Sequence, residues 1–580
     1  MIASELPAVA KVHQSLYSVQ GYASEGKKMT YRNLAELLSR QADRMGPRPA
    51  VRFKRNGLYH DLSWHDYAVQ VQACAAGLVE LGIAQGDRVG LLSENRLEWL
   101  LADMGILAAG AVNVPPHAPL TAQQVHYQLA DAEVRWLFVS TSKQLDKIRC
   151  IRGQLPLLKG VVVFDDSAAA ADAMSWTEFL ATGRHALGRL QGEIRRREQS
   201  LGADDLATII YTSGTTGNPK GVMLTHSNLL SNALATDDAS PRPPDSVLLN
   251  WLPFSHIYAR TVDHYLSLVA GVLLCLGESP ETVVDNLEET WPTHMSSVPR
   301  FYEKVLTAVK SDDVQETGRR LRKIFGPRID WLGSGGAPLP LSVAQEFQKA
   351  GLLILQGYGL TETSPVIAFN RKSHFKLETV GQAVPGVEIA CGSDSEVLTR
   401  GPHVMIGYWK NPEATAETIR DGWLHTGDLC RIDGEGFLTI TGRKKEILVL
   451  SNGKKIAPNY LEGLLLADAC IDQAVIFGEG RNFLTALIVP HWDNLRQALG
   501  TDLSARQNDS LAKDSGVNAF LARRIETALA DVSSWEKVKK FIILPRPFSV
   551  EAEELTVSLK MRRNVVFGKH KEELDRLYHS

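Results

Sequence analysis

The sequence predicts an α/β protein with a large N-terminal lobe of βαβ subdomains, a small β-rich subdomain and a smaller α+β C-terminal domain joined by a hinge. Short apolar runs alternate with helical patterns in the first part of the chain, which predicts parallel strands linked by right-handed helical crossovers. From about residue 380 the pattern changes to short strands separated by Gly-Asp, Asp-Gly and Gly-Glu-Gly sequences. A new helix–strand pattern begins after residue 442, and a chain of 580 residues is long enough for at least two hydrophobic cores.

The first elements of the large lobe follow from local patterns. Residues 51–66 predict a β-hairpin that turns at Asn56-Gly57, a dipeptide that two-residue hairpin turns favour. Apolar runs and helical periodicity then predict, in chain order, a strand over 88–93, a helix over 95–110, a strand edge over 112–116, a helix over 121–132 and a strand over 134–140. This alternation is typical of a parallel sheet covered by helices.

The last part of the chain divides into two regions. The segment "CRIDGEGFLTITG" (430–442) is typical of a small β-rich subdomain. Beyond it the sequence predicts a helix over 459–469 and strands over 472–478 and 483–490. We therefore expect an N-terminal domain of residues 1–442 and a C-terminal domain of residues 443–580, with the charge-rich "TGRKKE" as the hinge.

Composition limits the classes of function. The chain is 44% hydrophobic and 22% charged, which is typical of a globular protein, and a net charge of −3 gives no reason to expect nucleic-acid binding. The six cysteines are scattered without a C-x-x-C pair, so we expect reduced, buried thiols rather than disulfides or a zinc site. The most apolar run, residues 99–116, is interrupted by Asp103 and is too short to span a bilayer. Because no signal peptide is recognisable either, we expect a soluble, cytoplasmic protein.

The stretch "YTSGTTGNPKGVMLTH" (211–226) indicates an anion-binding loop. Small residues let backbone N–H groups approach phosphate oxygens, hydroxyls add donors, and Lys220 adds a positive charge. The flanking sequences predict a strand before the loop and a capped helix after it, which disfavours a flexible linker. A Walker-type phosphate loop is excluded because, counted from Gly214, Pro219 stands where glycine is required and Gly221 where serine or threonine is required.

This loop resembles the signature loop of the acyl-adenylate-forming superfamily, which includes acyl-CoA synthetases, firefly-type luciferases and the adenylation domains of peptide synthetases. Further motifs resembling those of that family follow in the same order: "WLPFSHIYAR" (251–260), "WLGSGGAPLP" (331–340), "QGYGLTETSPV" (356–366), "GWLHTGDL" (422–429), "TGRKKEILVLSNGKKIAPNYLE" (441–462) and "LTVSLKMRRNVV" (555–566). The resemblance covers nearly the whole chain, and several segments are most similar to bacterial long-chain fatty-acid–CoA ligases.

The resemblance implies an AMP-forming ligase reaction in two steps. A fatty-acid carboxylate attacks the α-phosphate of ATP, in the presence of Mg²⁺, and gives an acyl-adenylate and pyrophosphate. The thiol of CoA then attacks the acyl carbon and releases AMP. The N-terminal domain is expected to bind ATP and the acyl substrate, and the C-terminal domain to carry the catalytic lysine. Because anions meet in the first step, that step needs cations and N–H donors rather than a strong base.

The resemblance also implies the ATP-binding residues. The loop and its lysine are expected to bind the β- and γ-phosphates, and the glycine-rich "GSGGAP" to lie along the adenine. Tyr358 would supply a flat ring for the base, Asp428 would accept the two ribose hydroxyls, and Arg443 would bind ribose or phosphate. The full expected set is Thr212, Ser213, Gly214, Thr215, Thr216, Gly217, Lys220, Gly335, Gly336, Ala337, Tyr358, Gly359, Thr361, Asp428 and Arg443.

Four residues are implied as catalytic by the same resemblance. Glu362 is the expected Mg²⁺ ligand, Thr215 a phosphate-side contact, and His256 a residue near the α-phosphate and the acyl pocket. Lys560 is expected to bridge the acyl carboxylate and the α-phosphate. Long-chain ligases commonly carry Thr-Pro-Thr before Leu-Lys, whereas this chain has "TVSLK", with Val557 in place of proline. We therefore expect a less rigid loop before the lysine.

The second step is expected to use a rotated C-terminal domain. By the resemblance the hinge falls at Lys445, and the rotation would bring "SNGKK" to the adenylate, with Gly453 and Lys454 beside the pantetheine of CoA. The basic segment "KMRRNVVFGKHK" (560–571) is alternatively expected to bind CoA phosphates or anionic lipid, in a peripheral contact with the inner face of a membrane.

We therefore predict a fatty acid–CoA ligase, of the long-chain class. One alternative is a fatty acyl-AMP ligase or acyl-carrier-protein synthetase that passes the acyl group to a carrier protein. Such relatives typically carry an extra segment near the hinge, and none is evident between Gly386 and Arg443. A second alternative, a non-catalytic acyl- or nucleotide-binding protein, is disfavoured because the lysines and carboxylates of the motifs are all present.

Overall fold

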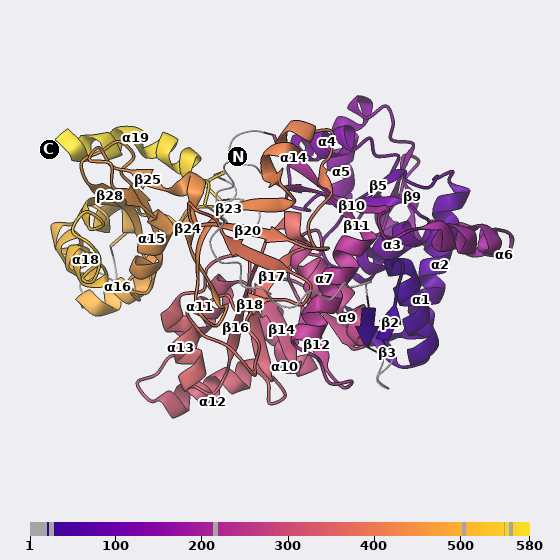
Figure 1. Ribbon diagram of the computed structural model, residues 1–580, viewed down its shortest axis with the longest axis horizontal. Coiled ribbons are helices and arrows are strands. Elements are labelled where there is room, and N and C mark those ends of the chain that lie inside the picture. The colour runs from indigo at the N-terminus through magenta and orange to yellow at the C-terminus, as the bar shows by residue number, and fades with distance from the viewer. Residues whose placement is uncertain are drawn as a thin grey trace, which may run out of the picture.

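The computed structural model describes residues 20–22, 28–212, 218–500, 506–549, 552–555 and 561–579. The large lobe contains two wide sheets with helices between and around them, a smaller sheet lies beside these, and a separate C-terminal domain follows (Figure 1). The predicted α/β class, with a β-rich subdomain and a smaller last domain, is confirmed.

The first wide sheet is the one that the βαβ pattern predicted. In chain order its elements and crossover helices are β5 (Arg88–Leu92), α3 (Leu97–Ala108), β6 (Val112–Val114), α4 (Ala122–Asp131), β7 (Trp136–Val139), α5 (Ser142–Ile151), β8 (Gly160–Val163), β9 (Met174–Ser175), β10 (Leu206–Thr212), β11 (Lys220–Thr225) and β21 (Gly407–Tyr408). The strand order is β21-β11-β10-β6-β5-β7-β8-β9. Because β5 is parallel to both β6 and β7, and β7 to β8, the predicted parallel units are confirmed.

The second wide sheet has nine strands in the order β18-β17-β16-β15-β14-β12-β13-β3-β4. The bounds are β3 (Pro49–Arg55), β4 (Leu58–Ser63), β12 (Val247–Asn250), β13 (Leu273–Leu276), β14 (His294–Ser297), β15 (Trp331–Ser334), β16 (Ile354–Gly359), β17 (Val366–Phe369) and β18 (Gln382–Ala383). The predicted hairpin is confirmed as β3 and β4, with Asn56 and Gly57 both at positive φ. It ends at Ser63 because the side chain of Ser63 accepts from the backbone N–H of Asp66 and starts a helix there.

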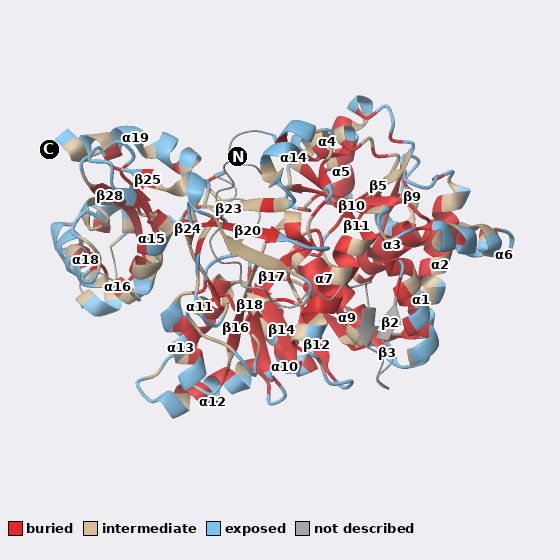
Figure 2. Cartoon of the chain, in the orientation of Figure 1, coloured by how far each residue is buried: buried red, intermediate tan, exposed pale blue. Residues whose placement is uncertain are grey.

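Helices fill the space around these sheets. Those of the large lobe are α1 (Leu34–Met45), α2 (Trp64–Glu80), α6 (Trp176–Ser200), α7 (His226–Ala239), α8 (Ile257–Ala259), the π-helical segment η3 (Arg260–Tyr265), α9 (Leu266–Ala270), α10 (Val283–Thr290), α11 (Pro299–Val309), α12 (Val314–Phe325) and α13 (Leu341–Lys349). Every residue of α3 is buried. One core cluster joins α3 to residues of both wide sheets, so the most apolar run of the sequence is a core helix (Figure 2).

A buried ion pair lies in this core. Arg260 and Asp103 are both fully buried, and the Nη2 atom of Arg260 donates to Oδ1 of Asp103 at 2.5 Å. Tyr265 donates to the other carboxylate oxygen at 2.9 Å, and Asn113 donates to Oδ1 at 2.6 Å. Arg260 also donates to the hydroxyl of Thr208 at 2.8 Å. The pair therefore connects α3, η3, β6 and β10 through hydrogen bonds that offset the cost of burying two charges.

The β-rich subdomain and the C-terminal domain both match their sequence patterns. The subdomain consists of β19 (Glu388–Cys391), β20 (Glu396–Arg400), α14 (Pro412–Thr418), β22 (Ile419–Arg420), β23 (Trp423–Ile432) and β24 (Leu438–Arg443). The C-terminal elements are η5 (Lys444–Glu446), β25 (Leu448–Val449), β26 (Lys455–Ile456), α15 (Pro458–Leu466), β27 (Ile471–Phe477), β28 (Leu484–Pro490), α16 (Trp492–Leu499), α17 (Asn508–Leu511), α18 (Ser515–Ala528), β29 (Val538–Ile543) and α19 (Arg563–His579). The predicted helix and two strands are α15, β27 and β28.

Two expectations need correction. The segment after the phosphate-type loop is not directly a helix, because β11 comes first and pairs antiparallel with β10. The capped helix is α7, whose capping box joins Thr225 and Asn228.

The thiols are free, but they are not all buried, because Cys150 is exposed on α5. In the part of the chain that the structure describes, no helix is long and apolar enough to cross a membrane.

We predict that Arg260→Met lowers the free energy of unfolding by about 3–5 kcal/mol, because the carboxylate of Asp103 would stay buried without its cation. Chemical denaturation followed by tryptophan fluorescence measures this change. The control is Arg149→Met, since Arg149 pairs with Asp146 and Asp172 at the surface and its loss is expected to leave the unfolding midpoint unchanged. An Arg260→Met midpoint equal to that of the control would contradict the prediction.

Candidate active site

The residues predicted to contact adenine and ribose come together where the second wide sheet meets the β-rich subdomain. The hydroxyl of Tyr358, near the end of β16, donates to Oδ2 of Asp428 on β23 at 2.6 Å. On β24, Arg443 donates from Nε to Oδ1 of the same carboxylate at 2.8 Å. Asp428 and Arg443 are also direct partners in the strand register. Residues predicted from three separate motifs therefore form one cluster.

The charges of this cluster have definite states. Burial raises the pKa of the Tyr358 hydroxyl well above its ordinary value, and the Asp428 carboxylate raises it further. Tyr358 therefore remains a neutral donor. Burial lowers the pKa of Arg443, but the charges of Asp428 and Glu446 and the hydrogen bond to Asp428 together outweigh it, and the net pKa lies above the ordinary value. The cluster thus holds a carboxylate between a neutral hydroxyl and a permanent cation, with Asp428 only 3% exposed.

Glycines allow close backbone approach beside this cluster. Gly335 directly follows β15, and a Cβ atom there would lie 2.9 Å from the ring of Tyr258. Gly336 has a φ of +80° and is exposed, as is Ala337. Gly359, at the end of β16, would place a Cβ 1.8 Å from the carbonyl oxygen of Pro365. A larger side chain is therefore excluded by backbone at Gly359, and at Gly335 it would require the ring of Tyr258 to shift.

A second cluster is centred on a residue that the sequence analysis missed. The hydroxyl of Tyr408, on β21, donates to Oε1 of Glu362 at 2.9 Å. The Nζ atom of Lys220, the first residue of β11, lies 4.9 Å from the centre of the same ring. Burial raises the pKa of Tyr408, and the charge of Glu362 raises it further, so the hydroxyl stays protonated. The available signal was the aromatic pair Tyr408-Trp409 before a Lys-Asn-Pro turn.

The phosphate-type loop connects two antiparallel strands. Thr212 ends β10 and is the register partner of Lys220, which begins β11. Helix α4 contacts both ends of the loop, because Tyr211 donates to the carboxylate of Asp131 at 2.5 Å and Tyr127 donates to the carbonyl of Pro219 at 3.2 Å. The other predicted loop residues lie outside the described part of the chain: Ser213, Gly214, Thr215, Thr216 and Gly217.

The remaining predicted residues of the N-terminal lobe are close to these elements. Nδ1 of His256 accepts from the backbone N–H of Tyr258 at 3.2 Å and thereby caps α8. Its ring stacks on His117, with the ring centres 6.2 Å apart. Burial lowers the pKa of His117 to about 4, so that imidazole is neutral at pH 7. Thr361 lies beside Glu362 in the 3₁₀ turn η4 (Thr361–Thr363).

The predicted hinge residue lies in a turn that contacts both domains. Lys445 is exposed in the middle of η5. On one side of it, Lys444 pairs with Asp394 of the β-rich subdomain at 2.6 Å. On the other side, Glu446 accepts from Asn459 of α15 at 2.6 Å. The contacts of η5 are therefore shared between the two sides of the predicted boundary.

The predicted CoA residues lie on the C-terminal domain. Gly453 has a φ of +78° in the exposed turn between β25 and β26, where a Cβ atom added to the glycine would meet no described atom within 4 Å. The Nζ atom of Lys454 lies 4.5 Å from the ring centre of Trp535, in the same domain. The structure thus places these two residues on a different unit from Tyr358 and Asp428.

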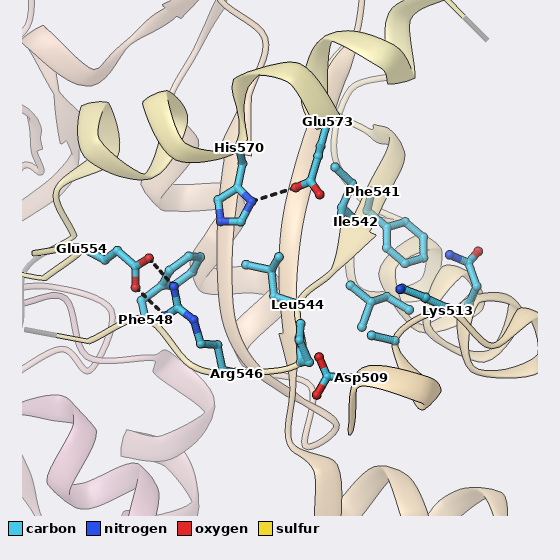
Figure 3. Close-up of a pocket in the computed structure, with 14 residues that line it drawn as sticks. Asp509, Lys513, Phe541, Ile542, Leu544, Arg546, Phe548, Glu554, His570 and Glu573 are labelled. Atoms are coloured by element: carbon cyan, nitrogen blue, oxygen red, sulfur yellow. Dashed lines mark hydrogen bonds and ion pairs between the residues drawn. The ribbon is translucent and has the colours of Figure 1, made fainter. Parts of the chain in front are cut away.

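Lys560 lies outside the described residues, but the chain on each side of it is described. Leu555 and Met561 form an antiparallel bridge, and Arg562 donates from its backbone to the carbonyl of Glu554 at 2.8 Å. The buried carboxylate of Glu554 accepts two bonds from Arg546, at 2.8 and 2.9 Å (Figure 3). The two ends of the segment that contains Lys560 are therefore held together.

A cavity lies beside these contacts, between β29, α17 and α19, with a volume of about 570 Å³. Apolar side chains such as Phe541 and Leu544 line it together with the pairs Arg546–Glu554 and His570–Glu573 (Figure 3). Of the predicted site residues that the structure describes, none lines it.

A carboxylate held by a tyrosine and an arginine, and a lysine at one end of a loop rich in glycine and hydroxyl groups, are compatible with nucleotide binding. The chain belongs to the family of AMP-binding enzymes. The family model described as AMP-binding enzyme matches residues 19–409, and the model of the AMP-binding enzyme C-terminal domain matches residues 445–580.

Several relatives are similar over most of the chain. The long-chain-fatty-acid–CoA ligase FadD15 of Mycobacterium tuberculosis is 34% identical, over 90% of this chain and 93% of that protein. The human long-chain-fatty-acid–CoA ligase ACSBG2 is 27% identical, over 94% of this chain and 92% of that protein. Among solved structures, ATP-bound MatB from Rhodopseudomonas palustris has a TM-score of 0.72 at 25% identity, covering 93% of this chain and 99% of that one. The anthranilate CoA ligase AuaEII has a TM-score of 0.76 at 20% identity, covering 94% and 98%, which shows the shared fold.

We predict that Asp428→Asn weakens ATP binding by about 10- to 100-fold, because a hydrogen bond to a charged group is worth about 1.5–3 kcal/mol and Arg443 would lose its anionic partner. Isothermal titration with ATP measures the dissociation constant. The matched control is Arg431→Gln, since Arg431 is exposed on the same strand and its loss is expected to leave ATP binding unchanged. Equal dissociation constants for Asp428→Asn and the wild type would contradict the role of Asp428.

A second prediction concerns acid stability. The bonds from Arg546 outweigh the effect of burial and lower the pKa of Glu554 from 4.5 to about 2. A depressed pKa adds stability that is complete above the unfolded value and is lost as the pH falls through the folded value. Glu554→Gln should therefore be less stable than the wild type at pH 7, and the difference should shrink between about pH 4.5 and pH 2. Urea-unfolding midpoints across this range measure it.

Glu553→Gln is the control for the acid-stability prediction, because Glu553 is the neighbouring, largely exposed carboxylate. It should follow the wild type at every pH. A stability difference between Glu554→Gln and the wild type that stays constant from pH 7 to pH 2 would show that the charge of Glu554 does not contribute.

Proposed function

We propose that this protein is an ATP-dependent, AMP-forming ligase that activates a long-chain fatty acid as acyl-AMP and transfers the acyl group to CoA. The observation that carries the proposal is the pair of side-chain clusters: Asp428 with Tyr358 and Arg443, and Tyr408 with Lys220 and Glu362. Membership of the AMP-binding family, and relatives named as long-chain-fatty-acid–CoA ligases along nearly the whole chain, support the choice of substrates.

The first cluster suits the nucleoside of ATP. The ring of Tyr358 offers a flat surface for adenine, and the glycine-rich backbone from Gly335 to Ala337 allows close approach to its edge. Asp428 is held in place by a hydroxyl and a guanidinium, so it can accept two neighbouring ribose hydroxyls without reorganising. Lys220 and the loop before it would bind the β- and γ-phosphates and then the pyrophosphate that leaves.

Glu362 fits a Mg²⁺ ion that is shared with the phosphates of ATP. Mg²⁺ sites of this kind use one or two carboxylates, phosphate oxygens and water. One oxygen of Glu362 is fixed by Tyr408, and the described residues contain no group of three or more His, Cys, Asp or Glu side chains that could hold a metal without a substrate. When bound, the ion would neutralise charge that develops on the phosphates.

The chain's own residues would bring two anions together in the first step. A carboxylate oxygen of the fatty acid forms a bond to the α-phosphorus, and the bond from that phosphorus to the bridging oxygen breaks as pyrophosphate leaves. Lys560 would contact both the carboxylate and the α-phosphate, and His256 lies on the segment that faces the glycine-rich backbone through Tyr258. Positioning and charge stabilisation carry this step, and no strong base is needed.

The second step would need a different arrangement of the domains. The sulfur of CoA bonds to the acyl carbon, the bond from that carbon to the phosphate oxygen breaks, AMP leaves, and the thiol proton passes to solvent. We propose that residues 443–580 rotate against residues 1–442 about Lys445, so that the turn with Gly453 and Lys454 replaces Lys560 beside the adenylate. A Cβ atom built at Gly453 meets no described atom within 4 Å, which supports the close approach of a pantetheine chain there.

The proposal is tested by mixing the purified protein with palmitate, ATP and Mg²⁺ and measuring AMP per enzyme, with and without CoA. Many turnovers that depend on CoA are expected. If instead about one equivalent of acyl-AMP stays bound to the enzyme and is not consumed on addition of CoA, the protein would be a ligase that passes the acyl group to a carrier protein. If no AMP forms with any saturated acid from C2 to C18, the proposal that the protein is a fatty acid ligase would be overturned.

Lys560→Ala separates the two steps. It should slow acyl-AMP formation by about 100-fold, the typical effect of losing one transition-state donor, while thioester formation from synthetic palmitoyl-AMP and CoA persists. Lys539→Ala, which removes an exposed lysine of β29, serves as the control and should retain both steps. Equal loss of both steps in Lys560→Ala would contradict the assigned role.

A further inference from the structure

Tyr408 lies between two groups of opposite charge that the proposed function needs separately. Its ring face contacts the ammonium of Lys220, and its hydroxyl contacts the carboxylate of Glu362. The side chain is 7% exposed and therefore has little freedom to move. A lysine and a glutamate that neutralised each other directly would be less available to phosphate and to a cation, whereas a tyrosine contacts each of them without cancelling either charge.

The backbone around Tyr408 is tied to the same two elements. Tyr408 pairs with Val222 of β11, and Trp409 donates from its backbone to the carbonyl of Gly221 at 2.7 Å. On the other side, Met405 donates from its backbone to the carbonyl of Glu362 at 2.9 Å. The segment from Met405 to Trp409 therefore joins the strand that begins with Lys220 to the turn that holds Glu362.

We propose that Tyr408 is a positioning residue, whose hydroxyl orients Glu362 toward the cation of Mg·ATP and whose ring holds Lys220 toward the phosphates. This inference rests on the proposed function and goes beyond it, because it assigns two separable roles to one side chain. A donor to one oxygen of a ligating carboxylate restricts its rotation and directs the other oxygen, and loss of such a partner typically weakens metal affinity by about 10- to 100-fold.

The two roles are separated by two substitutions. Tyr408→Phe removes the hydroxyl and keeps the ring, and Tyr408→Leu removes both. Isothermal titration gives the dissociation constant for ATP with EDTA and with saturating Mg²⁺. For Tyr408→Phe we expect an unchanged dissociation constant for ATP in EDTA and a dissociation constant about 10-fold larger than that of the wild type with Mg²⁺. For Tyr408→Leu we expect weaker binding in EDTA as well, by about 2- to 30-fold, because the cation–π contact to Lys220 is lost.

A double-substitution cycle tests whether the hydroxyl acts through Glu362. If it does, Tyr408→Phe should add no further loss of Mg²⁺-dependent binding in a Glu362→Gln background. The control for the segment is Trp409→Phe, which removes the bond from the indole to the carbonyl of Asp131 and should leave the Mg²⁺-dependent gain intact. Thermal melting of each variant establishes that it is folded.

Each outcome decides the inference. The positioning role would be overturned if Tyr408→Phe binds ATP like the wild type in both titrations, or if it weakens ATP binding equally in both. It would also be overturned if Trp409→Phe reduces the Mg²⁺-dependent binding as much as Tyr408→Phe does. A wild-type protein that gains no affinity for ATP on addition of Mg²⁺ would instead count against the proposed function itself. The two failures are thus distinguishable in the same set of titrations.

Discussion

The burial of Arg260 against Asp103 constrains the relative position of two parts of the proposed site. Two charges inside a protein are tolerated only with hydrogen bonds around them, and these bonds come here from η3, β6 and β10. The segment that ends in Arg260 carries His256 and Tyr258, and Tyr258 contacts Gly335. The strand that supplies Thr208 leads into the phosphate-type loop. One buried pair therefore relates the segment of His256 and Tyr258 to the strand before the loop, which are two parts of the proposed nucleotide site.

Tyrosines with desolvated hydroxyls recur as the donors that orient carboxylates around this site. Tyr358 donates to Asp428, Tyr408 to Glu362, and Tyr211, at the start of the loop, to Asp131. In each case burial raises the pKa of the hydroxyl, so that the donor is neutral and remains protonated. A neutral donor fixes the direction of a carboxylate and leaves its charge available, which a lysine partner would not do. The arrangement suits a reaction that depends on positioning and on fixed charge.

Local sequence patterns were enough to predict the parallel strands, the first hairpin and the C-terminal helix and strands, because each of these elements has its own periodicity or turn residues. The pairing of β11 with β10 was missed, since a six-residue strand that begins Lys-Gly carries little periodicity and its partner lies across the loop. Motifs located Tyr358, Asp428 and Arg443 separately, but only the fold brings them into one cluster. Tyr408 was missed because its role depends on contacts with two distant segments, which the aromatic pair Tyr408-Trp409 does not reveal by itself.

The contacts at the domain junction are compatible with the proposed rotation. Arg300 of α11 pairs with Asp472 of β27, and Lys444 pairs with Asp394, each through side chains that are partly exposed to solvent. Such pairs contribute little net stability and can be replaced by water, so breaking them costs little. Inside the C-terminal domain the contacts are tighter, because Glu446, Asn459 and the partly buried Arg563 form a continuous chain of hydrogen bonds to the start of α19. A rotation at Lys445 would therefore move α15 and α19 together.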